Sequence, residues 1–321
     1  MVRLNDIVHL ALMLAALAAA YLVPFELLLL AYVVLGPAHY ITEISWLHDR
    51  SYFLPHRGIA AVLACLAVIA AFVTNASWFG FLMWAVLIGC AMLAAATTAI
   101  EGMLIFMAAL ALTALMLSTE TSLGVIGILI PTLVHVCLFT LVFMTLGAIR
   151  AASRAQAVLV AAYLVAIAII LLLPPTAEVR IPGFARAAQE YFGNVGPALS
   201  RLFDIPGLTL GTRLTGLLAF VYTYHYLNWF IKVDIIRWAD VPKPRLALMV
   251  AASAASTALY FYSYTYGFVF LLALSLIHVL LEFPLNALAL RQLGGAATSG
   301  LRAAFATEAP VSGRRKAAKR R

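Results

Sequence analysis

Residues 155–174 read AQAVLVAAYLVAIAIILLLP, and this stretch decides the fold class because it contains no charged side chain. A helix of about 20 apolar residues is long enough to cross the hydrocarbon core of a bilayer. The whole chain has the same character, since 65% of its 321 residues are hydrophobic and only 11% are charged. Soluble domains carry roughly a quarter charged residues. The composition therefore excludes a soluble enzyme, a disordered protein and a disulfide-stapled secreted domain, and it indicates a polytopic membrane protein.

Further apolar runs of similar length follow one another along the chain, separated by polar or turn-forming residues. They predict an all-α transmembrane bundle of about ten spans, at 7–22, 25–47, 58–74, 78–96, 98–117, 122–148, 155–174, 211–233, 246–264 and 267–290. We expect residues 1–296 to form this membrane domain. The longer segment 176–208 is expected to lie on the side of the membrane opposite the cytoplasm, with an amphipathic helix at the membrane surface.

The positive charge is concentrated at the end of the chain. The net charge is +8, and residues 302–321 hold seven of the basic residues against one acid, Glu308. We predict that residues 297–321 form a disordered cytoplasmic tail beside anionic lipid headgroups, and that the N-terminus lies on the same side. No folded basic domain accompanies the tail, so we expect no nucleic-acid partner; the lipid bilayer is the expected one.

Four of the seven histidines fall within predicted spans that run in the same direction: His39, His135, His225 and His278. Each lies about 12–15 residues from the outer end of its span, which corresponds to about 18–22 Å at the helical rise. All four would therefore occupy one layer of the membrane. Ionisable residues in a membrane are costly and are typical of functional sites. Neighbouring helices would bring these imidazoles together as ligands of a metal ion, iron (Fe²⁺) first, with zinc and copper as alternatives.

Two carboxylates accompany these histidines. Glu43 follows His39 by four residues and Glu282 follows His278 by four, so each pair shares one helical face. Each glutamate would bind the metal or hold an imidazole in orientation. A hydrogen-bonded His–Glu pair that only stabilises helix contacts is the plainer alternative.

Tyrosines surround two of the histidines. Tyr40 is adjacent to His39, and His225 lies within Tyr222-Thr223-Tyr224-His225-Tyr226-Leu227-Asn228. Tyr40 and Tyr226 are predicted as catalytic residues, because the tyrosine hydroxyls would orient ligands or oxygen-derived species. Glu43 and Glu282 are predicted as catalytic residues with them. An ordinary aromatic belt at the membrane interface is the alternative. Glu101, early in the fifth predicted span, is a further acid at a compatible depth.

Residues 36–43, GPAHYITE, resemble the G-x-P-H-G-x-x-D element of the Brp/Blh family of bacterial membrane β-carotene oxygenases. Tyr40 stands where that element has glycine, Glu43 replaces its aspartate, and the proline is shifted by one position. The resemblance implies a multi-pass protein of the bacterial inner membrane that binds one iron through dispersed helix histidines and cleaves a carotenoid with dioxygen. His39 would then be an iron ligand, and Glu43 would take the place of the acidic residue.

The residues together predict an integral-membrane, metal-dependent oxygenase or hydroxylase, in which non-haem iron acts on an apolar lipid, isoprenoid or carotenoid. The chain contains no recognisable reductase domain, so any electron donor would be a separate molecule. Two alternatives stay open at this point. Histidines and glutamates in spans also serve proton-coupled transporters. Pairs of membrane histidines also bind haem in electron carriers.

Overall fold

The computed structural model describes residues 4–54, 56–72, 98, 100–104, 107, 133–173 and 210–307, and these residues are helical with no β-strand among them. The N-terminal half contributes α1 (Leu4–Leu22), α2 (Pro24–Leu30), the π-helical turn η1 (Ala31–Leu35), α3 (Gly36–His48), η2 (Ser51–Phe53) and α4 (Arg57–Phe72). The later part contributes η3 (His135–Phe139), α8 (Thr140–Ala151), α9 (Arg154–Leu172), α12 (Leu210–Ile231), α13 (Val233–Ile236), α14 (Lys243–Tyr262) and α15 (Tyr264–Thr307).

Five stretches of this part of the chain are long and apolar enough to cross a membrane, so the chain is a helical membrane protein as predicted. They are Leu4–Leu22, Pro24–His48, Arg154–Leu172, Lys243–Tyr262 and Tyr264–Ala296. Two shorter apolar helices, Arg57–Phe72 and His135–Ala151, coincide with parts of two further predicted spans. The predicted spans 78–96 and 98–117, most of the first half of 122–148, and the outside segment 176–208 lie largely outside the described residues.

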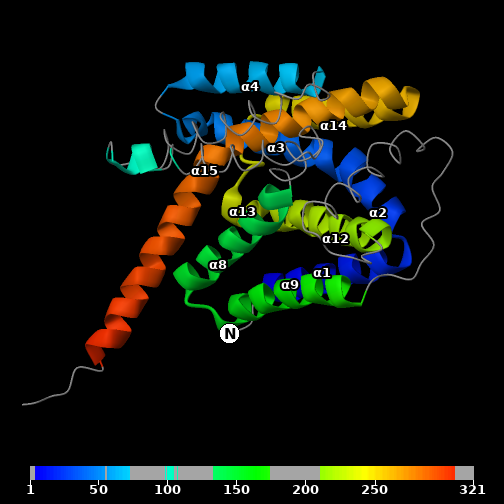
Figure 1. The fold of residues 1–321 in the computed structure, drawn as a ribbon. Helices are drawn as coiled ribbons and strands as arrows, with labels where there is room; N and C mark the ends of the chain where they lie inside the picture. Colours follow the sequence, from blue (N-terminus) through cyan, green and yellow to red (C-terminus); the bar gives the residue numbers. More distant parts are fainter. Residues whose placement is uncertain are drawn as a thin grey trace, which may run out of the picture.

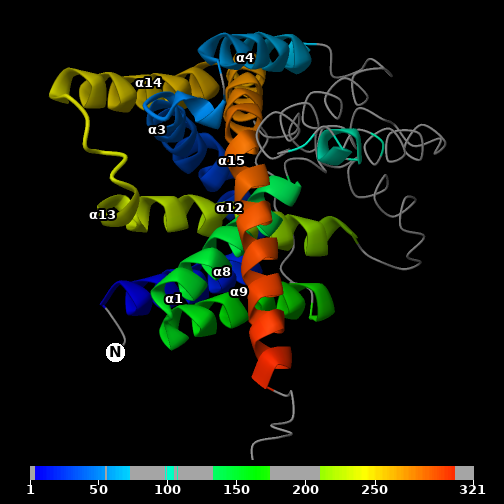
Figure 2. The same cartoon turned by 90° about the vertical axis from the view of Figure 1, so that its left-hand side faces the viewer.

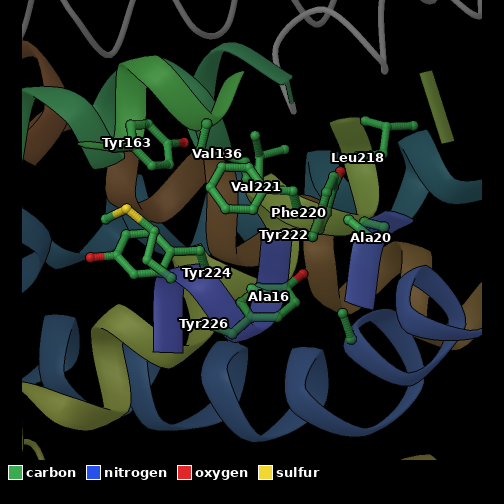
Figure 3. Packing of buried hydrophobic residues seen from close by; sticks show 14 of the residues in the cluster. Ala16, Ala20, Val136, Tyr163, Leu218, Phe220, Val221, Tyr222, Tyr224 and Tyr226 are labelled. Carbon is green, nitrogen blue, oxygen red and sulfur yellow. The ribbon is translucent and has the colours of Figure 1, made fainter. Parts of the chain in front are cut away.

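The helices form two layers around α12. In Figure 1, α3, α4 and α14 lie above it, and α1 and α9 lie below it. One core cluster joins the lower helices to α12 through Met13, Tyr163, Phe220 and Tyr224, and Figure 3 shows part of this packing. A second cluster joins α3 and α4 to α15 through Leu47, Leu63 and Leu280. Helices from both halves of the chain therefore meet between the two layers.

The candidate spans do not include α12, although it has 22 residues and was predicted as a span at 211–233. Its middle is rich in polar side chains, and every residue from Leu218 to Tyr226 is buried. A helix enclosed by other helices on all sides does not face lipid, so it tolerates polar groups that find partners within the protein.

The predicted second span is one continuous helix, Pro24–His48, but it is locally distorted just before Pro37. Proline lacks the N–H that would reach the carbonyl four residues earlier, so the Val33 carbonyl loses its helical donor. The π-helical turn η1 ends just before this point, and the Thr257 hydroxyl of α14 donates to the Val33 carbonyl at 2.9 Å. Gly36 leaves room for the Tyr40 ring, whose atoms would lie 3.2 Å from a Cβ at that position. This distortion lies within one helical turn of His39.

The connections that carry basic residues lie at one end of the bundle, together with the N-terminus. Figure 1 shows the N-terminus, the turn between α3 and α4, the turn between α8 and α9, and α13 on the left. Helix α15 continues to Thr307, into the segment 297–321 that was predicted as a disordered tail, and residues 308–321 lie outside the described part. Figure 2 shows this helix running along the side of the bundle and beyond it.

Candidate metal centre

The four predicted histidines meet in one place between the two layers. Each comes from a different element: His39 from α3, His135 from η3, His225 from α12 and His278 from α15. Their ring centroids form a closed ring, at 4.8 Å from His39 to His225, 5.0 Å to His135, 4.8 Å to His278 and 4.8 Å back to His39. All four side chains are buried. The structure therefore brings together the imidazoles that the sequence places at one depth.

Their nitrogen atoms have the spacing of a coordination shell. One ligand atom from each histidine lies within 4.8 Å of the other three, and the Nε2 atoms of His39 and His225 are 3.1 Å apart. Nitrogen ligands bind transition metals at about 2.0–2.1 Å, so two ligands at right angles are about 3.0 Å apart and two opposite ligands about 4.2 Å. A single ion therefore fits this set after a contraction of less than about 1 Å.

The two glutamates lie in the same cluster, and each contacts its predicted histidine and a second histidine on another helix. Glu43 Oε2 is 3.0 Å from His39 Nε2, as its spacing predicts, and also 3.1 Å from His278 Nε2 on α15. Glu282 Oε2 is 3.7 Å from His278 Nε2 but only 3.1 Å from His135 Nδ1. Each carboxylate thus joins two histidines from different helices, and Glu43, His278 and Glu282 form a second group with metal-ligand spacing.

A cation would stabilise this arrangement of charges. Glu43 and Glu282 are both buried, and among the described residues no lysine or arginine forms an ion pair with either carboxylate. An ionised carboxylate out of water costs several kcal/mol unless an opposite charge compensates for it. A divalent cation among four neutral imidazoles would compensate for both carboxylates at once, so the donor set fits a metal ion.

Polar residues outside this group orient two of the imidazoles. The Thr140 hydroxyl of α8 is hydrogen-bonded to His225 Nδ1 at 2.8 Å, which leaves His225 Nε2 for the centre. Asn286 Nδ2 lies 3.4 Å from His135 Nδ1. Within the described part of the structure, His39 Nδ1, His135 Nε2 and His278 Nδ1 have no hydrogen-bond partner. Unpartnered buried nitrogens are costly, and a ligand at the cluster would satisfy those that face it.

Tyr40 and Tyr226 were predicted beside the site, and both lie there. Their hydroxyls are hydrogen-bonded to each other at 2.5 Å, and both side chains are buried. The Tyr226 ring lies 4.9 Å from the His39 ring, and the Tyr40 ring lies 4.8 Å from the His278 ring. Burial on this scale excludes an interfacial belt as the explanation for these two tyrosines.

The other residues predicted near the histidines differ in their surroundings. Tyr224 makes its hydroxyl contact on the side of α1, 3.4 Å from His9 Nδ1, whereas the Tyr222 ring packs against Tyr226. Asn228 is buried, and its Oδ1 has no hydrogen-bond partner among the described residues. Glu101, considered as a further acid, is exposed and belongs to neither group with metal-ligand spacing.

Sequence reasoning missed Thr140, Asn286 and Trp229. Trp229 packs edge-on against His39 at 5.4 Å, and its indole N–H donates to Thr42 Oγ1 at 3.0 Å. Trp229 follows His225 by four residues, so helical spacing could have placed it on the same face. Thr140 and Asn286 reach histidines on other helices, which spacing within one segment does not reveal.

Comparisons of the chain with protein-family models, with curated proteins and with solved structures found no match.

Proposed function

We propose that this chain is an integral-membrane, metal-dependent oxygenase or hydroxylase that uses non-haem iron on an apolar substrate. The ring of four buried imidazoles with two carboxylates is the observation that carries the proposal. The six histidine and glutamate donors favour iron over zinc, because zinc prefers four ligands whereas mixed histidine and carboxylate sites with open positions are typical of non-haem iron. Ferrous iron held there would supply the activation of dioxygen.

The residues of the chain have separate roles in this proposal. His39, His135, His225 and His278 bind the metal. Six protein ligands on one ion would leave no position for a reactant, so at least one of Glu43 and Glu282 holds imidazoles in place instead of binding the ion. The paired hydroxyls of Tyr40 and Tyr226 supply a hydrogen bond or a proton beside the centre. The packed helices around the site exclude bulk water.

The geometry argues against a haem-binding electron carrier. A haem with two histidine ligands needs the imidazoles on opposite faces of a porphyrin. Four rings at 4.8–5.0 Å from their neighbours leave no room for that macrocycle between them. The cluster also gathers six titratable side chains in one compact group, whereas a proton-coupled transporter would be favoured by a row of such groups across the membrane.

The substrate follows from the surroundings of the site. The candidate spans around it present apolar surface, so a molecule dissolved in the bilayer reaches the protein at high local concentration. The substrate class is therefore an apolar lipid, an isoprenoid or a carotenoid, the last in keeping with the resemblance of residues 36–43 to the Brp/Blh element. Because of the same resemblance, the proposed location is a bacterial inner membrane. If the reaction is a hydroxylation, a separate electron donor completes it.

Metal analysis of the purified protein tests this proposal. We expect about one iron per wild-type chain, and loss of most of it in His39→Ala and in His278→Ala. His48→Ala is the matched control, because His48 is half exposed and lies on α3, which also carries His39. Oxygen uptake that depends on both iron and an apolar substrate would support the reaction class. Wild-type protein without stoichiometric iron, zinc or copper would contradict the proposal.

A further inference from the structure

The turn between α3 and α4 has a costly backbone conformation. Ser51, Tyr52 and Phe53 have φ angles of 50°, 57° and 55°, although none of them is glycine. Residues with a side chain visit this left-handed region singly, so three in succession are held there by their surroundings. Strained backbone of this kind is typical of binding sites. Here it holds the Tyr52 ring edge-on to His48 of α3, with 6.0 Å between the ring centroids.

Two arginines from different helices lie near this tyrosine. Arg57 begins α4, and Arg245 lies in the first turn of α14. Burial raises the pKa of Tyr52, whereas the positive charges of Arg57 and Arg245 lower it, so both guanidinium groups act on its hydroxyl. Arg57 Nε donates to Ser51 Oγ at 3.3 Å, and Arg245 donates to both Asp49 oxygens. Within the described part of the chain, the terminal nitrogens of Arg57 and the Tyr52 hydroxyl remain as donors for a ligand.

These donors suit a phosphate group. Guanidinium groups present paired N–H donors that match two phosphate oxygens, and the tyrosine hydroxyl adds a donor from another direction. Asp49 brings a negative charge that opposes an anion, but Arg50, Arg57 and Arg245 together leave an excess of positive charge. The guanidinium of Arg50 lies 3.9 Å above the Trp46 ring, so it stays beside the turn.

The depth of the turn favours a lipid as the source of the phosphate. Arg245 lies in the first turn of the candidate span Lys243–Tyr262, and Asp49 directly follows the candidate span Pro24–His48. The ends of spans lie at the level of the lipid headgroups, where tryptophans such as Trp46 are also enriched. A cluster of basic residues at this level attracts anionic lipids.

We propose that Arg57, Arg245 and Tyr52 bind the phosphate group of an anionic phospholipid. The acyl chains of this lipid lie on the apolar surface of α4 and α14, where Val62 and Leu248 are exposed. The bound lipid connects the starts of α4 and α14 across the strained turn. The site shares no residue with the histidine cluster, so the inference does not depend on the proposed function.

Binding of phosphatidylglycerol with a fluorescent acyl chain, to the full chain in an uncharged detergent, tests this site. We expect Arg57→Gln to weaken binding about fivefold, because a basic residue near an anionic lipid contributes about that factor. Tyr52→Phe removes one hydrogen bond and should weaken binding about two- to tenfold. Asp49→Asn should strengthen binding about two- to fivefold, since it removes the opposing charge. A purely structural role of the turn would not give this gain.

Arg154→Gln is the matched control, because Arg154 is exposed and begins α9 at the same end of the bundle (Figure 1). It should bind the labelled lipid as the wild type does. Unlabelled phosphatidylglycerol should displace the label, whereas phosphatidylcholine and inorganic phosphate at the same concentration should not.

Equal affinities in the wild type, Arg57→Gln and Tyr52→Phe would overturn the site. An equal loss in Arg154→Gln and Arg57→Gln would overturn it as well, because the attraction would then be a property of the whole basic end. Displacement by inorganic phosphate as effective as that by phosphatidylglycerol would assign the site to a soluble anion and overturn the lipid.

Discussion

At the scale of single residues, the centre depends on a few atoms that connect different helices. Glu43 contacts His39 on its own helix and His278 on α15, so it holds two of the four imidazoles together. Thr140 fixes the ring of His225 through Nδ1. Because the ring of histidines is closed, the loss of one such atom affects the whole centre.

Removal of the Thr140 hydroxyl should weaken metal binding without removing a ligand. Thr140→Val keeps the shape of the side chain, and outer partners of metal-binding histidines are worth about 10–100-fold in affinity. We expect a loss in that range, measured by competition with a chelator. Thr145→Val is the control, because the Thr145 hydroxyl donates only to the Leu141 carbonyl of the same helix. Equal affinities in the two variants would show that Thr140 does not orient His225.

Removal of the Glu43 charge should also weaken metal binding. Glu43→Gln keeps the length of the side chain, but it removes a negative charge that faces two imidazoles. We expect metal affinity to fall by more than tenfold, because charge compensation and imidazole orientation are both lost. Glu26→Gln, at an exposed position of α2, should bind the metal as the wild type does. A Glu43→Gln protein with wild-type affinity would exclude this carboxylate from the centre.

The sequence predicted the members of the centre better than their contacts. Helical spacing placed Glu43 beside His39, and this contact is present at 3.0 Å. The contact of Glu282 with His135 and that of Glu43 with His278 depend on how separate helices pack. Spacing within one segment holds no information on such contacts, which is also why Thr140 was missed.

At the scale of elements, close helix packing positions the histidines. Gly267, near the start of α15, lies against α14, and a Cβ there would come within 2.2 Å of the Tyr260 Cα. The obstacle is backbone, which cannot move aside as a flexible side chain can. Glycine is therefore required where α14 turns into the helix that carries His278.

Gly267→Ala should force α14 and α15 apart. Overpacking of this kind costs about 1–3 kcal/mol, and a backbone clash belongs at the upper end of that range. We expect a lower thermal midpoint and weaker metal binding. Gly294→Ala on the same helix is the control, because nothing lies within 4 Å of the added carbon, and the better helix former is expected to leave stability unchanged or slightly higher. Equal stability of the two variants would contradict the packing of this hairpin.

A surface ion pair ties α3 to α14. Arg245 donates to both Asp49 oxygens, at 2.8 and 3.0 Å, and this hydrogen bonding holds the pKa of Asp49 below its ordinary value. A lowered carboxyl pKa means that the stabilisation is present above pH about 4 and is lost as the pH falls through the pKa of the folded state. The Asp49 side chain is 42% exposed, so the pair is worth only about 0.5–1 kcal/mol.

Asp49→Asn should lower the free energy of unfolding by that amount at neutral pH, and the difference from wild type should shrink in acid. Thermal unfolding in detergent between pH 3 and pH 7 measures this. Asp240→Asn serves as the control, since Asp240 pairs with Arg237 three residues away and joins no two helices. A difference from wild type that grows in acid would reverse the assigned sign.

At the scale of the whole molecule, the composition predicted a helical membrane protein, and five candidate spans confirm that class. The helix predicted at 211–233 is present as α12 (Leu210–Ile231), but its polar side chains keep it out of the candidate spans, and its middle is enclosed by protein. The span count of ten and the orientation of the ends stay predictions, since a large part of the relevant chain lies outside the described residues.

The orientation has a direct test. The turns with Arg50, Arg57, Arg150 and Arg154 lie at the end of the bundle where the N-terminus lies, and the positive-inside rule puts that end in the cytoplasm. A fluorescent protein fused after Arg321 should therefore fluoresce, and alkaline phosphatase fused there should be inactive. The same phosphatase inserted at residue 176, in the predicted outside segment, should be active. The opposite pattern would reverse the assigned sides.

The central claim is that four imidazoles from four different elements bind one metal ion inside the membrane domain. X-ray absorption at the metal edge of the purified wild-type protein measures it most directly. The claim predicts a first shell of nitrogen and oxygen at about 2.0–2.2 Å with the outer-shell scattering of three to four imidazole rings. A shell without imidazole scattering, or a purified protein with no stoichiometric metal to measure, would contradict it.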